Sequence, residues 1–275
     1  MTGFLPASAG IFGWPVAQSK SPIIHRFWLH KLGMDGDFSR FPVHPEQLAA
    51  AVRAVPALGL RGVNITVPHK INVMDHLDVI AVSAQALGAV NTVHVLADGR
   101  LAGANTDIDG VLEPMRHLAL AGRAVVVVGT GGAARAAVTA AMQAGAGWLT
   151  IVARDAGKAA ALLDKTGLAG VISEFGAPLP HADDTALFFN ATSLGMSGQP
   201  ALPVDLTQLP SVTTVFDAVY APLETPLLAA ARARGMPVID GLQMLVGQAA
   251  TAFEIFFGAP APRQHDAELR GLLTQ

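Results

Sequence analysis

"VVVVGTGGAARAAVTAAM", residues 125–142, is the stretch of sequence that decides the fold. Four consecutive valines predict a strand buried on both faces, and the alanine-rich run after them predicts a helix. Between the two, Gly129, Gly131 and Ala134 follow the spacing G-x-G-x-x-A. Small residues at this spacing let the backbone approach a pyrophosphate, which the positive end of the helix then stabilises. The stretch predicts a Rossmann-type dinucleotide-binding unit; the alternative is a tight strand-to-helix turn that binds nothing.

More apolar strands follow this stretch. Short apolar runs, separated by loops or alanine-rich helical segments, occupy residues 148–152, 186–190, 212–217 and 236–240. Continuous apolar strands that alternate with helices are typical of a parallel sheet covered by helices on both faces. The sequence therefore predicts a parallel α/β unit that begins near Arg123.

The chain before Arg123 alternates strands and helices as well, which predicts a second α/β unit. Strands are expected at 10–14, 38–43, 62–67 and 90–96, and helices at 21–33 and 45–59. These helices carry apolar residues at helical spacing and end at Gly33 and Gly59. Residues 241–258 predict a strongly apolar helix that needs a partner surface, and the sequence does not decide which unit supplies it. A last short helix is expected after residue 263.

The composition indicates a globular chain with a sizeable core and favours a small-molecule ligand. The chain has 275 residues, 51% of them hydrophobic and 14% charged, a net charge of -3 and no cysteine. A net charge of this sign and size does not indicate the basic surface that binds nucleic acid or an anionic membrane. The lack of cysteine excludes disulfides, thiolate zinc sites and cysteine nucleophiles. The first positive charge is Lys20, and no apolar run reaches the ~18 residues of a membrane span, so a cytoplasmic protein is expected.

Other catalytic motifs lack their parts. No G-x-S-x-G elbow surrounds Ser193, no P-loop pattern occurs, and the nine histidines show no H-E-x-x-H spacing. We therefore exclude a serine hydrolase of that type, a P-loop nucleotidase and a zinc protease, and we expect no metal.

"VNITVPHK", residues 63–70, carries polar residues at the end of an expected strand. Strand residues alternate between faces, so one face carries Val63, Ile65 and Val67. The opposite face carries Asn64 and Thr66, which need a ligand or hydrogen-bond partners. Pro68 cannot donate to a sheet ladder and ends the pairing, which leaves Lys70 at the carboxyl end of the strand. Open α/β sheets bind ligands at that end.

Further polar residues gather at the ends of expected elements. They are Ser19 and Ser21, Asn91 and Thr92, and Asn105, Thr106 and Asp107. Taken singly, those before a helix suit helix caps and Asn91 suits a turn. Their accumulation in a chain with few charges suits a polyhydroxylated substrate.

The cofactor choice depends on "VARDAGK", residues 152–158, after the second strand of the parallel unit. An acid here holds the ribose 2′-hydroxyl of NAD, whereas an arginine accommodates the 2′-phosphate of NADP. Arg154 and Lys158 against one acid, Asp155, favour NADP. Two alternatives stay open, namely NAD binding through Asp155 and a solvated loop.

Eight motifs, in this order, resemble the shikimate dehydrogenase family along nearly the whole chain. They are "SKSP", "NITVPHK", "GAVNT", "NTD", "GTGGAAR", "NATSLGM", "VYAPLETPLL" and "GLQMLVGQA". The resemblance implies an α/β fold in which residues 1–106 plus 242–275 form a substrate-binding domain and 107–241 a Rossmann NADP-binding domain, with the active site in the cleft between them. It also implies the reversible, NADPH-dependent reduction of 3-dehydroshikimate to shikimate in chorismate and aromatic amino-acid biosynthesis.

The resemblance also implies site residues. Lys70 and Asp107 would form the catalytic pair. Substrate would be bound by Ser19, Ser21, Asn64, Thr66, Asn91, Tyr220 and Gln248. NADP would be bound by Gly129, Gly131, Gly132, Ala133, Ala134, Arg154, Lys158, Thr192, Ser193, Gly241 and Met244.

The resemblance leaves the cofactor, the oligomeric state and the activity partly open. The stretch "ARD" replaces the "NRT" that usually marks NADP binding in the family, although Arg154 is kept. The alternatives are an NAD-dependent quinate/shikimate dehydrogenase and a nucleotide-sensing protein of the same fold without activity. Monomers and homodimers both suit the fold.

Overall fold

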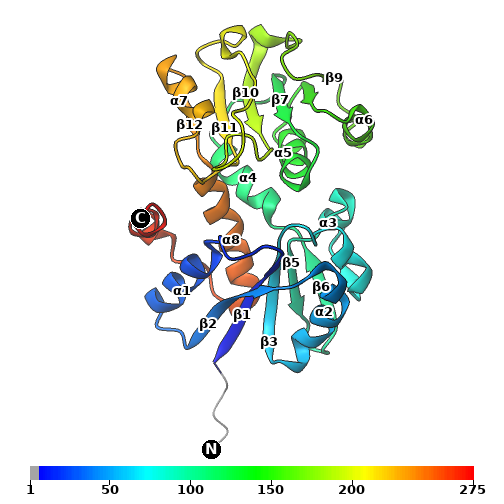
Figure 1. Cartoon of the computed structure of the whole chain (residues 1–275), viewed down its shortest axis with the longest axis vertical. Helices are drawn as coiled ribbons and strands as arrows, with labels where there is room; N and C mark the ends of the chain where they lie inside the picture. The colour runs from blue at the N-terminus through cyan, green and yellow to red at the C-terminus, as the bar shows by residue number, and fades with distance from the viewer. Residues whose placement is uncertain (1–5) are drawn as a thin grey trace, which may run out of the picture. The chain divides into compact units, whose positions relative to one another are not determined.

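The computed structural model describes residues 6–275 and divides into two compact units (Figure 1). The first unit consists of the chain up to Thr106 together with Val246–Gln275, and the second consists of Asp107–Leu245. The first unit is thus discontinuous in sequence, because its last segment follows the whole of the second. Assigning substrate to the first unit and cofactor to the second stays a prediction.

A six-stranded mixed sheet forms the centre of the first unit, with strand order β2-β1-β3-β5-β6-β4. Its strands are β1 (Ala7–Gly13), β2 (Gly36–Pro42), β3 (Leu60–Ile65), β4 (Val79–Ile80), β5 (Thr92–Val95) and β6 (Leu101–Ala104). The strand β1 runs parallel to β2 and β3, whereas β5 runs antiparallel to β3 and β6. The helices and 3₁₀ turns of this part are α1 (Ser21–Lys31), η1 (Pro45–Gln47), α2 (Leu48–Ala57), η2 (Asn72–His76), α3 (Val82–Leu87), η5 (Arg263–His265) and α9 (Asp266–Leu273).

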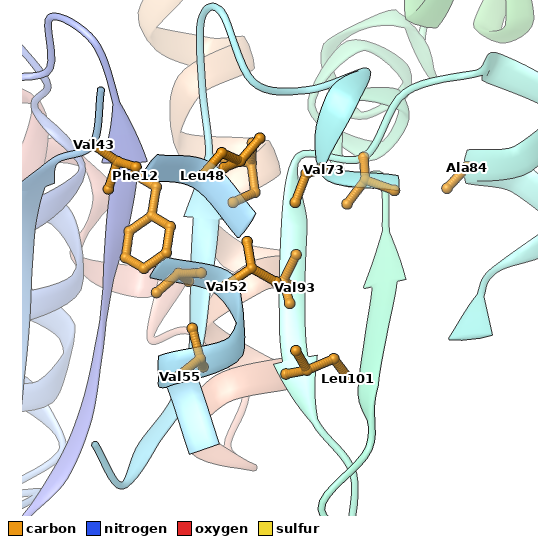
Figure 2. Close-up of a cluster of buried hydrophobic side chains, with 12 residues drawn as sticks. Phe12, Val43, Leu48, Val52, Val55, Val73, Ala84, Val93 and Leu101 are labelled. Atoms are coloured by element: carbon orange, nitrogen blue, oxygen red, sulfur yellow. The ribbon is translucent and has the colours of Figure 1, made fainter. Parts of the chain in front are cut away.

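Helices bury both faces of this sheet. On one face Val52 and Val55 of α2 pack against Phe12 and Val93, as Figure 2 shows. On the other face β1 and β2 pack against Ala252 and Phe256 of α8 (Gly241–Phe257). The apolar helix whose partner surface the sequence left undecided therefore packs with this part of its length on the first sheet.

The second unit has a six-stranded sheet of order β12-β11-β10-β7-β8-β9, and every pair in it is parallel. Its strands are β7 (Ala124–Val128), β8 (Trp148–Val152), β9 (Gly170–Ser173), β10 (Thr185–Asn190), β11 (Thr214–Asp217) and β12 (Val238–Ile239). Its helices and 3₁₀ turns are α4 (Asp107–Met115), α5 (Gly132–Gln143), α6 (Ala156–Asp164), η3 (Ala182–Asp184), η4 (Leu206–Gln208) and α7 (Pro226–Ala233). Because all the strands are parallel, their carboxyl ends meet at one edge.

The strand expected at 62–67 is shorter than the alternation predicts. β3 ends at Ile65, and the chain turns from Val67 onward. The prediction that Val67 shares the buried face of Val63 and Ile65 is wrong, since this residue is 68% exposed. The reason is that Pro68 lacks the N–H that would extend the pairing.

Candidate functional site

The glycine loop after β7 has the shape that a phosphate requires. Gly129 has a φ of +110°, and a Cβ added to it would lie 3.1 Å from Cγ2 of Thr192. Gly131 is the N-cap of α5, and a Cβ there would meet no atom within 4 Å. Gly131 has no side chain, so the N-cap residue makes no capping bond to the first turn of α5. Backbone N–H groups at a helix N-terminus favour an anion, so the loop fits the pyrophosphate of a dinucleotide.

The next strand-to-helix turn carries the residues predicted to select the cofactor. Arg154 and Lys158 are exposed, and Asp155 is the N-cap of α6. One oxygen of Asp155 accepts a hydrogen bond from the backbone N–H of Lys158 at 3.0 Å, and the other lies 3.2 Å from its Nζ. These contacts lower the pKa of the Asp155 carboxyl. Asp155 is therefore engaged within the protein, which weakens the alternative that it holds a ribose.

Four buried residues at the ends of β3, β5 and β6 form what we call the asparagine cluster: Asn64, Asn91, Thr92 and Thr106. The Nδ2 of Asn64 donates to Oγ1 of Thr92 at 3.0 Å, which in turn donates to Oδ1 of Asn91 at 2.9 Å. The Nδ2 of Asn91 donates to Oγ1 of Thr106 at 3.0 Å, and its Oδ1 accepts from the Thr106 N–H at 2.8 Å. Two residues predicted to bind substrate, Asn64 and Asn91, are thus brought together and locked in orientation.

One acceptor of the asparagine cluster is left over. Among the described residues Oδ1 of Asn64 is buried without a hydrogen-bond partner. An unsatisfied buried carbonyl costs about 1–3 kcal/mol, so such an atom calls for an explanation. A hydroxyl of a bound ligand would satisfy it. Thr66, the third polar residue of this segment, is partly buried just beyond β3.

The two serines before α1 are close together. Oγ of Ser19 lies 3.3 Å from both the backbone N–H and Oγ of Ser21. The N-cap of α1 is Lys20, and no side chain accepts a capping bond there among the residues described. The interpretation of either serine as the N-cap is therefore wrong. The guanidinium of Arg40, which the sequence analysis missed, donates to the Ser19 carbonyl through Nε at 3.0 Å and also through a terminal nitrogen.

Lys70 lies in the turn after β3 and is partly buried. Its backbone carbonyl accepts from the N–H of Val90 at 2.8 Å. The preceding residue, His69, is buried, and its Nε2 lies 2.8 Å from the carbonyl of Val43. The turn that carries Lys70 is thus fixed on two sides, and His69 is a second residue that the sequence analysis did not single out.

Asp107 is the buried first residue of α4. It opens the second unit, whereas Lys70 belongs to the first. Their pairing therefore stays a prediction.

The other predicted site residues lie at the carboxyl end of the second sheet or in α8. Thr192 is partly buried and Ser193 is exposed after β10, and Tyr220 is partly buried after β11. Burial raises the pKa of the Tyr220 phenol. Met244 is buried and Gln248 partly buried within α8. The loop of Thr192 thus follows a strand next to β7, which carries the glycine loop.

Within residues 6–275 no group of three or more His, Asp or Glu side chains is arranged to hold a metal ion. No helix there is both long and apolar enough to cross a membrane.

The parallel sheet and its glycine loop define a Rossmann-type, dinucleotide-binding class of protein, and comparisons with known proteins narrow it further. Residues 11–93 match the family described as shikimate dehydrogenase substrate binding domain, and 241–268 match the shikimate 5'-dehydrogenase C-terminal domain. The shikimate dehydrogenase (NADP(+)) of Sphingopyxis alaskensis is 49% identical over 269 residues, which cover 97% of this chain and 96% of that protein.

Two solved structures are similar along almost the whole chain. The shikimate 5-dehydrogenase of Thermus thermophilus, in complex with NADP(H) and shikimate, has a TM-score of 0.87 at 35% identity and covers 97% of this chain and 99% of its own. The ligand-free 5-ketofructose reductase of a Gluconobacter species has a TM-score of 0.89 at 36% identity and covers 98% and 100%. The chain belongs to the shikimate dehydrogenase family.

Proposed function

We propose that this protein catalyses the reversible, NADPH-dependent reduction of 3-dehydroshikimate to shikimate, a step of chorismate and aromatic amino-acid biosynthesis. Family membership supports the reaction, because relatives named for it match 97% and 94% of the chain. The structural observation that carries the substrate class is the asparagine cluster, with the unpartnered Oδ1 of Asn64. A polyhydroxylated ring offers the hydroxyl donor that this atom lacks.

NADP fits the second unit. Gly129, Gly131, Gly132, Ala133 and Ala134 would hold the pyrophosphate against the first turn of α5. Arg154 and Lys158 would pair with the 2′-phosphate, since both are exposed cations, in the turn after β8 and in the first turn of α6. Thr192, Ser193, Gly241 and Met244 would line the nicotinamide half. When bound, NADPH supplies the hydride.

The first unit would orient the substrate. Ser19 and Ser21 would donate their hydroxyls to the carboxylate, and Tyr220 of the second unit would do the same. Asn64, Thr66, Asn91 and Gln248 would bind the ring hydroxyls or the carboxylate. The locked orientation of Asn64 and Asn91 supports this role, because donors and acceptors that are fixed before binding lose little entropy when the ligand arrives.

Lys70 would act as the general acid. As the ketone carbon is reduced, its oxygen gains negative charge, and the Lys70 ammonium donates a proton to that oxygen. An ionised Asp107 would favour the charged form of the lysine. In the oxidative direction the neutral amine takes the hydroxyl proton back. The fixed turn around Lys70 supports this role because it limits where the ammonium can reach.

The experiment is absorbance-monitored oxidation of shikimate, quinate and the reduced form of 5-ketofructose by the purified protein, each with NADP⁺ and with NAD⁺. We expect the highest kcat/KM for shikimate with NADP⁺. A preference for NAD⁺, or equal use of quinate, would replace the proposal with a quinate/shikimate dehydrogenase. Tight NADPH binding with no turnover of any substrate would leave a nucleotide-sensing role.

A cytoplasmic location and a monomeric or homodimeric state stay predictions. Cell fractionation tests the first, and size-exclusion chromatography with light scattering tests the second.

A further inference from the structure

A buried carboxylate stands at the carboxyl end of the second sheet with no role in the proposed reaction. Asp217 ends β11 and lies beside Asn190, the last residue of the neighbouring β10, in register. Both side chains are fully buried. The Nδ2 of Asn190 donates to Oδ1 of Asp217 at 2.9 Å.

Asp217 accepts two further hydrogen bonds. The backbone N–H of Val219 donates to Oδ1 at 3.0 Å, and the hydroxyl of Thr225 donates to Oδ2 at 2.6 Å. No cation of the described chain pairs with it, and burial raises the pKa of its carboxyl. Burying a charge without a cation is expensive, so its three neutral donors must stabilise it. We call Asp217, Asn190 and Thr225 the carboxylate network.

One arm of the carboxylate network reaches the cofactor side. Oδ1 of Asn190 accepts from both the N–H and the hydroxyl of Thr192, at 3.0 and 2.7 Å. Its Nδ2 also donates to the Leu194 carbonyl at 3.1 Å. The methyl of Thr192 in turn packs beside Gly129 of the glycine loop. Asn190 therefore fixes the loop that is predicted to lie along the cofactor.

The other arm fixes the loop that carries Tyr220. Val219 and Thr225 flank this loop, and each donates to Asp217. Oγ1 of Thr225 also accepts from the N–H of Leu228 at 3.2 Å and caps α7. Both ends of the segment between Val219 and Thr225 are thus tied to one carboxylate.

From these contacts we propose that Asp217 is a positioning residue that holds the Thr192 loop and the Tyr220 loop in a single arrangement, and so supports cofactor and substrate binding together. The proposal rests on the proposed function, which assigns Thr192 to NADP and Tyr220 to the substrate carboxylate. Asp217 touches neither ligand in this scheme. It acts through Asn190 on one loop and through Thr225 and the Val219 N–H on the other.

The test compares Asp217→Ala with Asp217→Asn. NADPH affinity is measured by fluorescence titration without substrate, and the KM for shikimate by steady-state kinetics at saturating NADP⁺. We expect Asp217→Ala to raise the NADPH dissociation constant and the KM for shikimate about tenfold each. The reason is that it removes hydrogen bonds to a charged group from both loops. Asp217→Asn keeps an acceptor for Asn190 and Val219 and can donate to Oγ1 of Thr225, so both constants should stay within about threefold of the wild type.

Variants of single arms separate positioning from mere folding. Asn190→Ala should raise the NADPH dissociation constant while the KM for shikimate stays the same. Thr225→Val should do the reverse. The matched control is Asp183→Ala, at an exposed aspartate of the same unit, and it should change neither constant. If Asp217→Ala does not fold, the two arm variants still decide.

The outcomes that overturn the proposal are distinct from failure of the proposed function. A folded Asp217→Ala protein with a lower melting temperature but unchanged constants would show a structural role only, as would arm variants without effect. If the wild type does not oxidise shikimate, the proposed function fails. NADPH titration of Asp217→Ala and Asn190→Ala still tests the cofactor arm in that case.

Discussion

The asparagine cluster of the first unit and the carboxylate network of the second occupy similar places, at the ends of sheet strands, yet they differ in what they leave unsatisfied. The asparagine cluster is built from neutral groups and keeps one buried acceptor, Oδ1 of Asn64, without a partner among the residues described. The carboxylate network contains a buried charge, and both oxygens of Asp217 accept hydrogen bonds. The carboxylate network is complete with protein groups, whereas the asparagine cluster leaves one acceptor unsatisfied.

This difference matches the two proposed roles, substrate binding for the asparagine cluster and loop positioning for the carboxylate network. A fully satisfied buried network rigidifies the backbone around it, whereas an incomplete one gains free energy when a ligand completes it. An unpartnered atom is not enough by itself, however. Both ring nitrogens of His25 also lack partners within residues 6–275, but the ring is fully buried and stacks on Phe38 with centroids 4.0 Å apart. Asn64 differs because it lies at the end of a strand, beside other polar groups.

The largest expected effect tests whether the proton transfer depends on Lys70 and not on the asparagine cluster. Lys70→Ala should lower kcat about a thousandfold, because the general acid is lost, with little change in the KM for shikimate. Stopped-flow and steady-state kinetics measure both. Lys165→Ala, at an exposed lysine, is the matched control. Full turnover by Lys70→Ala would remove the lysine from the mechanism.

The next effect tests whether exposed cations, rather than either buried network, select the cofactor. The double variant Arg154→Ala/Lys158→Ala should raise the KM for NADP⁺ about a hundredfold, since two charge-assisted contacts to the 2′-phosphate are lost. The KM for NAD⁺, which lacks that phosphate, should not change. Equal weakening toward both cofactors would contradict this assignment and indicate a damaged loop.

A pH series measures how the unpartnered, buried His25 changes the free energy of unfolding. Burial lowers the pKa of His25 from 6.5 to about 3. The unfolded chain therefore binds a proton at this site below pH 6.5 while the folded chain does not, so stability is present above that pH and is lost as the pH falls. Between pH 6.5 and pH 5 the loss should be about 2 kcal/mol.

Urea denaturation at several pH values measures the effect of His25. The variant His25→Phe, which keeps an aromatic ring in the cluster, should lack this part of the pH dependence. His30→Gln, at an exposed histidine of the same helix, is the control and should retain it. An unchanged slope in His25→Phe would show that other groups cause the acid sensitivity.

The smallest effect sharpens the comparison directly. Asn64→Ala should raise the KM for shikimate about tenfold and leave NADPH affinity unchanged, because one hydrogen bond to the substrate is lost. Asn190→Ala should show the opposite pattern. The same kinetic and fluorescence measurements serve both variants. If both changed the same constant, the two networks would not have separate roles.

The sequence predicts the parts of the fold with strong local patterns. The central strands β7, β8, β10 and β11 all lie in short, largely apolar runs, and the sequence predicts all four, as it does α8. It misses β6, whose sequence "LAGA" has only one large side chain, and the four-residue β9. Such short strands depend on their neighbours in the sheet rather than on their own side chains.

The candidate site divides in the same way. Asn64 and Asn91 stand out because they are polar residues in apolar surroundings, and the structure brings them together. The sequence does not single out Asp217, because its partner Asn190 lies 27 positions earlier and the register of the two strands brings them together. The sequence does not single out His69 either. Its partner is the backbone carbonyl of Val43, and residue types do not predict which backbone atom a side chain will contact.

The discontinuity of the first unit has a consequence for synthesis of the chain on the ribosome. Asp107–Leu245 is one continuous segment, but the first sheet lacks the side chains of Ala252 and Phe256 until Val246–Gln275 has been translated. Domains generally fold as units during translation. The second unit is therefore complete in sequence before the first, although translation of the first begins earlier. Until α8 emerges, the face of β1 and β2 that carries Phe38 is covered only in part, by α1, and the rest of that nascent surface is the part a chaperone would have to protect.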